Sequence, residues 1–433
     1  MNITVIGGGL AGVEAAWIAA NMGVPVNLIE MRPQKMTPAH RTGDLCELVC
    51  SNSLGSNVLP GASALLKSEL KSLGSLIIEC AEMHQVPAGR ALAVDREAFS
   101  REITERVASH PLINLSRREL NSIPTSRPLI IATGPLTSGD FAQSIDLLLG
   151  EGSLYFFDAV SPVVIADSVD MSRAFWASRY SSGVGDYLNC NLTEEEYGNF
   201  WKELVSGRVV EKRTFESNKL FEACLPIEEM ARRGRDTIRF GPLKPVGLFL
   251  PGSGDRPYAV VQLRKEDSEG RLLGLVGFQT RLTFPEQKRV FRLIPALKDC
   301  RFARLGVMHR NSFIRSPAHL DQFLVLKGAP GIFFAGQITG VEGYLSSAAT
   351  GLAAGFFAAR NLLGKSLVPF PPQTCLGGLI TYVSSSPSKN FQPMGINFGL
   401  LPPVPGVRPK KARREAAVKR ALKAMAEFIA END

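Results

Sequence analysis

The first thirty residues constrain the fold of this chain more than any other stretch. A short apolar segment, Ile3–Ile6, leads into a glycine-rich turn at 7–12, and an alanine-rich apolar run follows to about Met22. A second apolar segment, Val24–Glu30, ends on an acidic residue. Strand, glycine turn, helix, strand and carboxylate, in this order, are typical of a dinucleotide-binding βαβ unit. We therefore expect an α/β fold that begins with a Rossmann-like domain.

The glycines of this unit have separate tasks in such a fold. Gly7 permits the tight turn, Gly9 lets the backbone approach a pyrophosphate, and Gly12 lets the helix pack closely on the strand. Glu30 lies 18 residues after Gly12, near the spacing of a carboxylate that accepts from a ribose 2′-hydroxyl. Such a carboxylate would repel a 2′-phosphate, so the held cofactor is expected to be FAD or NAD rather than NADP. The cofactor-binding residues expected here are Gly7, Gly8, Gly9, Leu10, Ala11, Gly12 and Glu30.

Two later segments have the pattern of a sheet edge that meets a cofactor. Leu129–Ala132 is apolar and stops at Thr133-Gly134-Pro135, and Ile332–Gly336 is apolar and ends in glycine. A polar, glycine-rich turn to Tyr344 and a run of small residues follow the second segment. Its helix N-terminus would offer N–H groups to the flavin end of FAD, although one more ordinary βα unit would look the same. The residues expected at this end are Gly134, Gly336, Gln337 and Tyr344.

The pattern of the chain changes twice along its length. Residues from about 154 to 320 are richer in aromatic and charged side chains, and Thr193 with Glu196 predicts a capping box that opens a helix. From about Gly331 the pattern of the first region returns. We therefore expect a first part of the cofactor domain at 1–153, an inserted α+β domain at 154–325, and a second part at 326–433. The length of 433 residues predicts about two or three domains.

One packing helix is expected over residues 64–78. Its leucines recur at helical spacing, while Lys67, Glu69 and Lys71 fall on the opposite face. This pattern predicts a packing helix with those three charges on the face opposite its leucines.

Composition excludes several classes of protein. No apolar run reaches the roughly 18 to 20 residues of a membrane span, and the first strand follows the N-terminus with no basic leader, so we expect a cytoplasmic protein without a membrane partner. The seven cysteines are scattered, which fits a reduced compartment. No C-x-x-C and no Cys/His cluster occurs, so no metal is expected.

The charge of the chain indicates an anionic partner. The net charge is +8, from 49 basic and 41 acidic residues. The last segment, 408–433, holds eight Lys or Arg and four acids, and Lys410 and Lys411 open its basic stripe. Nucleic-acid phosphates are the usual counterpart of such a stripe, although a solvated face of a terminal helix would have the same pattern. No DNA-reading motif is present, so DNA is not expected as a partner.

Three cysteines stand in informative surroundings. Cys46 is best interpreted as a small buried hydrophobe, whereas Cys50 borders a polar loop and is open to either interpretation. Cys224 lies between carboxylates and a run of cations that includes Arg232, Arg233 and Arg235. Clustered guanidiniums lower a thiol pKa and also hold phosphate, although a solvated basic face beside an incidental thiol would look the same.

Together these motifs resemble one family, the bacterial folate- and FAD-dependent tRNA (uracil-5-)-methyltransferases, which are related to the GidA-type flavoproteins. The family pattern is matched in order along nearly the whole chain. The matching stretches are Ile6–Gly12, Leu48–Ser53, Ala93–Arg96, Tyr187–Cys190, Phe221–Pro226, Gly277–Thr280, Gly306–Asn311 and Gly336–Tyr344. The resemblance implies a Rossmann-like (GR2-type) FAD-binding domain interrupted by an α+β insertion domain. We expect a monomer or a weak homodimer, although the sequence does not settle the oligomeric state.

The resemblance further implies methylation at C5 of the T-loop uridine, position 54 of tRNA. The one-carbon unit would come from 5,10-methylenetetrahydrofolate, and the electrons from NADH or NADPH through FAD. C5 of uracil is a poor nucleophile, and attack of a thiolate on C6 makes it enolate-like. No second nucleotide fingerprint is present, so the reductant is expected to visit the flavin transiently.

Residue roles follow from the same resemblance. Cys224 would attack C6, and Cys50 would act as the helper acid or base or protect the flavin, with the reverse assignment left open. His309 would stack on the folate pteridine. The residues expected to meet RNA phosphates are Arg232, Arg233, Arg235, Lys410 and Lys411.

Four alternatives stay open from the sequence. Methylation of 23S rRNA or a GidA-like tRNA modification would use a similar chain. A flavin oxidoreductase acting on a small metabolite would leave the basic tail idle. A non-catalytic RNA-binding flavoprotein would bind RNA without reduction of its flavin by NAD(P)H.

Overall fold

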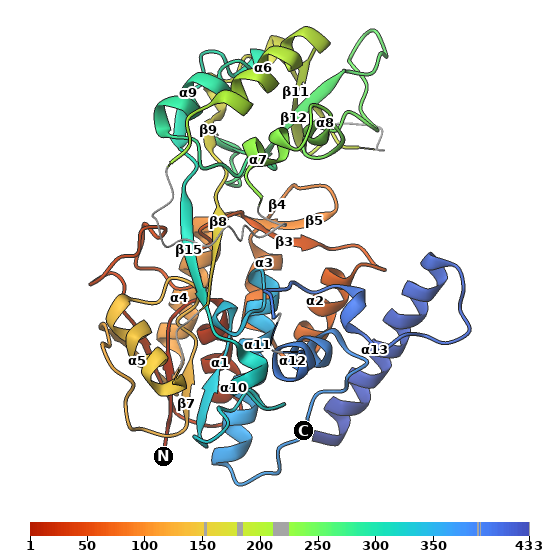
Figure 1. Ribbon diagram of the computed structural model, residues 1–433. Coiled ribbons are helices and arrows are strands. Elements are labelled where there is room, and N and C mark those ends of the chain that lie inside the picture. Colours follow the sequence, from red (N-terminus) through yellow and green to blue (C-terminus); the bar gives the residue numbers. More distant parts are fainter. Residues whose placement is uncertain (151–153, 180–184, 211–224, 388, 390, 433) are drawn as a thin grey trace.

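Two lobes, connected by a pair of long antiparallel strands, make up the molecule (Figure 1). The computed structural model describes residues 1–433 except 151–153, 180–184, 211–224, 388, 390 and 433. For residues 154–159 and 308–310 it describes the backbone strands but not the side chains. Both chain ends belong to the lower lobe of Figure 1.

A five-stranded parallel sheet organises the lower lobe. Its strands are β1 (Ile3–Ile6), β2 (Val26–Glu30), β6 (Ile113–Arg117), β7 (Leu129–Ile131) and β16 (Ile332–Phe334). Their order is β16-β7-β1-β2-β6, and every neighbouring pair is parallel. β16 comes from the last quarter of the chain and pairs with β7. The Rossmann-like α/β fold expected from the glycine pattern is therefore confirmed, and the late apolar segment completes the same sheet.

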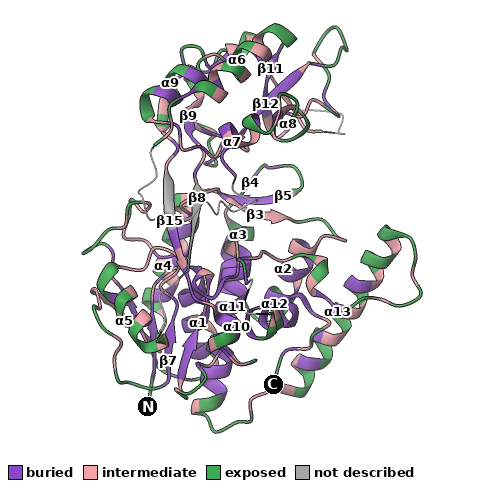
Figure 2. Ribbon diagram, in the orientation of Figure 1, coloured by how far each residue is buried: buried purple, intermediate pink, exposed green. Residues whose placement is uncertain are grey.

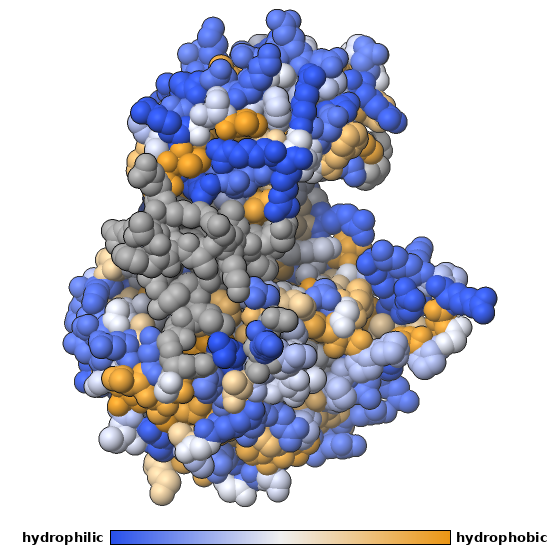
Figure 3. Space-filling model, viewed as in Figure 1, coloured by the Kyte–Doolittle hydropathy of each residue, from blue (hydrophilic) through white to orange (hydrophobic). Residues whose placement is uncertain are grey.

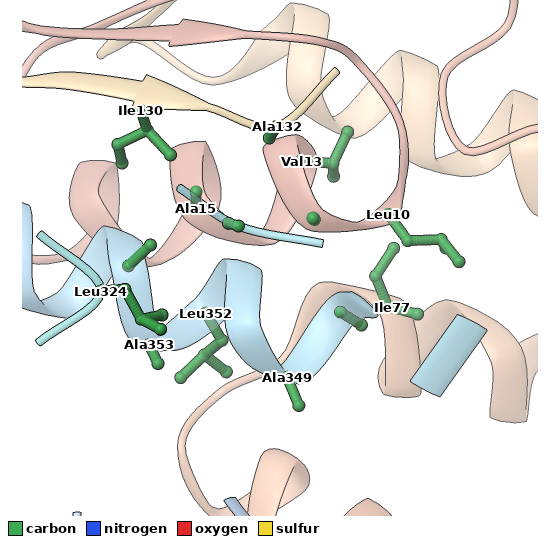
Figure 4. Close-up of a cluster of buried hydrophobic side chains, with 14 of the residues drawn as sticks. Leu10, Val13, Ala15, Ile77, Ile130, Ala132, Leu324, Ala349, Leu352 and Ala353 are labelled. Atoms are coloured by element: carbon green, nitrogen blue, oxygen red, sulfur yellow. The ribbon is translucent and has the colours of Figure 1, made fainter. Parts of the chain in front are cut away.

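Two helices rich in small residues pack against each other beneath this sheet. They are α1 (Leu10–Asn21) and α11 (Tyr344–Leu362), and α11 is buried along nearly its whole length. A Cβ added at Gly351 of α11 would lie 2.1 Å from the carbonyl oxygen of Ala11. The small side chains thus allow backbone-to-backbone approach. Figure 4 shows the apolar cluster around this contact, with Val13 on the side of α1 near Ala132, and with Leu352 and Ala353 on α11.

The single helix expected over 64–78 is wrong. The chain forms α2 (Ala62–Ser72) and α3 (Leu76–Met83), separated at Gly74, whose φ of +78° lies in the left-handed region. Lys67 and Glu69, on the face opposite the leucines, are buried, with 4% and 0% exposure. Helical spacing alone could not show that other segments supply polar partners to both side chains.

These partners are backbone groups distant in sequence. The ammonium of Lys67 donates to the carbonyls of Leu54, Gly55 and Ser56, and burial lowers its pKa to about 8. The carboxylate of Glu69 accepts from the N–H groups of Cys375 and Leu376 at the start of α12 (Cys375–Ser385). Glu69 therefore supplies the cap that satisfies first-turn donors of another helix.

An antiparallel sheet with helices on it forms the upper lobe. Its strand order is β10-β11-β12-β13-β9-β14. The predicted capping box of Thr193 and Glu196 is confirmed at the start of α6, whose Tyr197, Phe200 and Leu204 are buried. The strands are β9 (Val163–Ile165), β10 (Ala174–Ala177), β11 (Tyr187–Leu192), β12 (Ala259–Lys265), β13 (Leu272–Leu275) and β14 (Phe302–Arg304), and the helices are α6 (Glu194–Ser206), α7 (Ile227–Arg232), α8 (Thr237–Phe240) and α9 (Phe284–Phe291).

Strands β8 (Leu154–Ala159) and β15 (Met308–Phe313) pair antiparallel between the lobes. A small sheet of β3 (Ser53–Ser56), β5 (Ala91–Val94) and β4 (Gln85–Val86) lies on the side of the lower lobe that faces the upper lobe (Figure 1). Polar contacts cross there. Asn52 donates to the carbonyl of Lys265 at 3.0 Å, and the Tyr187 hydroxyl donates to that of Ala88 at 3.0 Å.

The C-terminal helix α13 (Lys410–Asn432) docks through an apolar face. Its buried residues include Val418, Met425 and Phe428, and the Phe428 ring lies 4.7 Å from that of Phe370. The outer face of α13 is exposed in Figure 2. The remaining helices of at least four residues are α4 (Arg96–Ser109), α5 (Gly139–Leu149) and α10 (Ser316–His319). Among the described helices, none combines the length and apolar character needed to cross a bilayer.

Candidate active site

A hollow of about 770 Å³ opens at the carboxyl ends of the parallel strands. Ligands of open α/β sheets bind at this edge. Most of the predicted cofactor-binding residues line it, namely Gly7, Gly9, Leu10, Ala11, Glu30, Gly134, Gly336, Gln337 and Tyr344. Gly8 and Gly12 do not. A Cβ at Gly12 would lie 1.8 Å from the carbonyl oxygen of Gly7, so Gly12 serves the contact between turn and helix.

Two helix N-termini point into this dinucleotide pocket. α1 begins after Gly9 and α11 after Gly343, and neither N-cap supplies a side-chain hydrogen bond to its first turn. No acidic residue occupies either first turn. The first-turn N–H groups and the positive end of each helix dipole therefore suit a pyrophosphate and a polar ring edge. The residues present fit FAD.

Glu30 is held more firmly than the sequence indicated. Its carboxylate is 5% exposed and accepts from the N–H of Gly8 at 2.7 Å and from the N–H and Nε of Arg32, both at 2.9 Å. Burial raises the pKa of Glu30, but the charge and hydrogen bonds of Arg32 outweigh burial and hold it below its ordinary value. Glu30 is thus ionised and stabilises the glycine turn, in addition to lining the pocket.

A second, smaller hollow of about 410 Å³ adjoins the first. It shares Gly7, Glu30, Met31 and Thr133 with the dinucleotide pocket and adds Arg118 and Phe141 among others. Sequence reasoning missed Arg32, Arg118 and Phe141. Arg32 lies two residues past the fingerprint, and the other two come from connections that carry no recognised motif.

Cys50 sits at the rim of the dinucleotide pocket. Its N–H donates to the hydroxyl of Tyr344 at 2.7 Å, and Tyr344 lines the pocket. Its carbonyl accepts from Arg96 at 3.0 Å and from Arg304 at 3.4 Å. Cys50 is half-buried, whereas Cys46 is 1% exposed and burial raises its thiol pKa well above the ordinary value. The surroundings therefore suit chemistry at Cys50 and packing at Cys46.

Arg96 connects the lobes beside Cys50. It begins α4, donates to the carbonyl of Leu48, and pairs through Nε with the Glu266 carboxylate of the upper lobe at 2.6 Å. Burial lowers the pKa of Arg96, but Glu266, Tyr344 and Cys50 raise it above its ordinary value. The guanidinium therefore remains charged and places a positive charge beside Cys50.

Two further hollows meet the segment Val49–Cys50. One, of about 490 Å³, lies between Cys50 and the upper lobe and is lined by Arg264, Gln279 and Arg304 among others. The other, of about 840 Å³, is lined by Val49 and Arg304 and by a group of exposed residues, Arg41, Phe284 and Lys288. Arg264 and Arg304 are far apart in sequence and follow no local pattern, so sequence reasoning missed them.

The other predicted catalytic and folate residues are only partly placed. Cys224 falls within 211–224, outside the described residues. Leu225, the next described residue, is buried, and the N–H of Ile227 donates to the carbonyl of Gln279 at 2.8 Å. His309 belongs to β15, and its side chain is outside what is described. Farther along β15, the N–H of Ser312 donates to the carbonyl of Pro135, next to Gly134 of the dinucleotide pocket.

The predicted RNA-contacting residues fall into two separate groups. Arg232, Arg233 and Arg235 are exposed at and after the end of α7 in the upper lobe, where Arg232 pairs with Glu229 at 2.7 Å. Lys410 and Lys411 are exposed in the first turn of α13 in the lower lobe. The structure therefore places the two basic groups on different lobes (Figure 1).

Among the described residues, no group of three or more His, Cys, Asp or Glu side chains has the arrangement of a metal site.

Comparisons with known proteins agree with this geometry. A family model described as "Glucose inhibited division protein A", GIDA, matches residues 2–366. "Methylenetetrahydrofolate--tRNA-(uracil-5-)-methyltransferase TrmFO" of Heliobacterium modesticaldum is 55% identical over 433 residues, covering 100% of this chain and 99% of that protein. The enzyme of the same name from Aquifex aeolicus is also 55% identical over 433 residues, covering 100% of this chain and 97% of that protein.

A solved structure shares the fold at much lower identity. The form I crystal structure of Aquifex aeolicus GidA superposes with a TM-score of 0.69 at 16% identity, covering 98% of this chain and 75% of that chain. At this identity the likeness concerns the fold alone. From the family match and the full-length identity to the TrmFO proteins, the chain belongs to the GidA family and, within it, to the TrmFO group.

Proposed function

We propose that this protein is a methylenetetrahydrofolate-dependent tRNA (uracil-5-)-methyltransferase that acts on the T-loop uridine at position 54. Identity of 55% to TrmFO proteins over the full length of the chain supports the activity. One structural observation carries it. Tyr344 lines the dinucleotide pocket and accepts a hydrogen bond from the N–H of Cys50, which also lines the hollow between the lobes. A bound flavin and the Cys50 thiol would therefore act on the same uracil ring.

The reaction needs a thiolate, a base and a hydride. Addition of the thiolate to C6 of uracil gives C5 enolate character, so that C5 attacks the methylene group of the folate. A base then takes the C5 proton, the folate amine leaves with its electron pair, and hydride addition with loss of the thiolate completes the methyl group. Bound FAD would supply that hydride after receiving it from NADH or NADPH.

We assign Cys224 as the C6 nucleophile and Cys50 as the neighbouring acid, base or protecting thiol. The backbone of Cys50 is fixed on both sides, by Tyr344 at its N–H and by Arg96 and Arg304 at its carbonyl. This fixed position suits proton transfer, which requires hydrogen-bond distances. His309 is proposed to stack on the folate pteridine.

The RNA would lie over the cleft between the lobes. The hollow lined by Val49 and Arg304 carries Phe284, 53% exposed, beside Arg41 and Lys288. An exposed aromatic ring among cations suits an unstacked nucleotide and its phosphates. We propose further backbone contacts at Arg232, Arg233, Arg235, Lys410 and Lys411. On this proposal the protein works where tRNA is made and modified, in the cytoplasm, as a monomer or weak dimer with domain boundaries near 153 and 325.

The decisive experiment combines the purified protein with unmodified tRNA, methylenetetrahydrofolate and NADPH, and measures 5-methyluridine in RNA digests. Wild-type protein should form it, Cys224→Ala and Cys50→Ala should not, and Cys46→Ala should remain active. Parallel reactions with 23S rRNA test the alternative substrate. Bleaching of the flavin by NADPH without product in either RNA would favour a plain flavin oxidoreductase. Binding of tRNA without bleaching would favour a non-catalytic flavoprotein.

A further inference from the structure

A separate pocket lies between Cys50 and the upper lobe. Its volume is about 490 Å³, and it shares no lining residue with the dinucleotide pocket. The lower lobe contributes Cys50 and Ser51, and the upper lobe contributes Arg264, Gln279 and Arg304 among others. We call this hollow the Cys50 pocket.

The Cys50 pocket has an excess of positive charge. Its one acidic lining residue, Glu266, is 7% exposed and already pairs with Arg96 at 2.6 Å. Neither Arg264 nor Arg304 forms an ion pair with any carboxylate in the described part of the chain. Burial and the charge of Arg96 lower the pKa of Arg304 to about 10, and the nearby Glu266 offsets only part of this effect.

The two guanidiniums also retain unused donors. A guanidinium has five N–H donors in a planar fork. Arg304 makes two hydrogen bonds, to the carbonyls of Val49 and Cys50, both at 3.4 Å, and Arg264 makes one of 3.4 Å to Ser51 Oγ and a contact with Tyr187. The Nε atoms of both are buried without a partner among the described residues. The few, long hydrogen bonds leave guanidinium N–H groups available to an oxyanion, which binds guanidinium through strong charge-assisted hydrogen bonds.

A neutral amide completes the polar lining. The backbone carbonyl of Gln279 accepts from Ile227, whereas its side-chain amide makes no hydrogen bond to any residue that the structure describes. An amide offers one acceptor and two donors. Uracil presents an N3–H donor beside a carbonyl acceptor, so the amide can pair with both atoms of that edge, as amides pair with base edges elsewhere.

We infer that the Cys50 pocket binds the target nucleotide of the RNA, with Arg264 and Arg304 on its phosphate and the Gln279 amide on the edge of its uracil ring. This inference rests on the proposed function and deepens it, since it names the residues that select the substrate. The pocket places the ring beside Cys50, whose N–H donates to Tyr344 of the dinucleotide pocket. The glutamate tail of a folate also carries anionic carboxylates. The experiment below therefore distinguishes an RNA phosphate from a folate carboxylate as the anion bound by Arg264 and Arg304.

The test measures KM for unmodified tRNA and for methylenetetrahydrofolate separately in Arg264→Gln and Arg304→Gln. Arg301→Gln is the matched control, because Arg301 is exposed in the same lobe outside the pocket. We expect KM for tRNA to rise about tenfold or more in each pocket variant, and the salt slope of RNA binding to fall by about one. KM for the folate, flavin content and reduction of the flavin by NADPH should stay unchanged.

Several outcomes would overturn the inference. A rise in KM for the folate with an unchanged KM for tRNA would assign the pocket to the glutamate tail, and no change in either would show that it binds neither. If Arg304→Gln loses flavin, Arg304→Lys keeps the charge and should retain tRNA binding. If wild-type protein forms no 5-methyluridine, the proposed function fails, and filter binding of tRNA to the same variants then decides whether the pocket holds RNA.

Gln279 provides the specificity test. Gln279→Ala should lower kcat/KM for tRNA by about 5- to 150-fold, with the folate KM unchanged, whereas Gln143→Ala, an exposed glutamine on α5, should have no effect. Gln279→Glu should be at least as impaired, since a carboxylate offers no donor to the uracil carbonyl. Full activity of both Gln279 variants would remove this side chain from base recognition.

Discussion

At the scale of single residues, the hydrogen bond between Cys50 and Tyr344 connects the thiol segment to the dinucleotide pocket. The Cys50 N–H donates to the Tyr344 hydroxyl at 2.7 Å. Arg96 and Arg304 hold the Cys50 carbonyl on the other side. Neither contact is local in sequence, so the position of the thiol depends on the fold of the whole chain.

Tyr344→Phe should therefore lower both turnover and stability. Loss of the hydroxyl leaves the part-buried Cys50 N–H without its acceptor, at a cost of about 1–3 kcal/mol in unfolding free energy. We expect kcat to fall by about tenfold, because the thiol loses its fixed position. Tyr382→Phe is the control, since the Tyr382 hydroxyl likewise bonds to the backbone, here as the donor to the Gln392 carbonyl, outside the site. Equal loss of kcat in both variants, measured as 5-methyluridine formed, would contradict the positioning role.

Buried carboxyls give the protein an unusual dependence on pH. Burial raises the pKa values of Glu14 and Glu69 to about 7 from an ordinary 4.5, although each accepts backbone N–H bonds. The folded state thus binds these protons more tightly than the unfolded state. Stability from these groups is present below pH 4.5 and is lost as the pH rises to about 7.

We expect the unfolding free energy, measured in urea, to fall between pH 5 and 7.5 by on the order of 3 kcal/mol for each group. Glu69→Gln should flatten part of this slope, because the amide cannot ionise. Glu82→Gln, an exposed carboxylate on α3, should leave the slope unchanged. A slope that stays the same in Glu69→Gln would show that Glu69 does not titrate in this range.

At the scale of elements, sequence reasoning succeeded where the pattern is local. Three such patterns are each confined to a short stretch of sequence, and the structure contains all of them: the glycine turn, the Thr193 capping box and the late strand–glycine–helix unit. It failed for Lys67 and Glu69, whose partners come from β3 and α12. It also missed Arg304 and Arg264, because a pair of cations facing one pocket from different strands has no spacing to detect.

The contact between α1 and α11 depends on the absence of a side chain at Gly351. Gly351→Ala would place a Cβ 2.1 Å from the Ala11 carbonyl oxygen, so the helices must separate. We expect a loss of roughly 1–3 kcal/mol in unfolding free energy and weaker flavin retention, because both helix N-termini face the pocket. Gly198→Ala in α6, where the nearest atom lies 3.4 Å away, should instead be neutral or stabilising by about 0.5–1 kcal/mol. Denaturation of both variants beside flavin absorbance checks this.

At the scale of the whole molecule, the cleft between the lobes and the two basic groups define how RNA would approach. Hydrophilic side chains cover much of the upper lobe and the outer end of α13 on the face shown in Figure 3. The Cys50 pocket lies where the lobes meet, held by the Arg96–Glu266 pair and the bond from Asn52 to Lys265. A substrate that fills the pocket and also reaches α7 and α13 must be far larger than a nucleotide.

This arrangement predicts that the two basic groups act independently on one RNA. Two double variants test this, Lys410→Glu with Lys411→Glu and Arg232→Glu with Arg233→Glu. Each should weaken tRNA binding and lower the salt slope of binding by about one for each phosphate that is no longer neutralised. Because the pairs lie on different lobes, their free-energy losses should add in the fourfold variant. Filter binding over a salt series measures both quantities. The same measurement on a short T-arm hairpin gives a second test. Binding of the hairpin should be unaffected by substitutions in a basic group that it is too short to reach, whereas binding of full-length tRNA should be weakened by substitutions in either group. If neither pair changes the binding of either RNA, these side chains are only a solvated surface, and the RNA is held by the cleft alone.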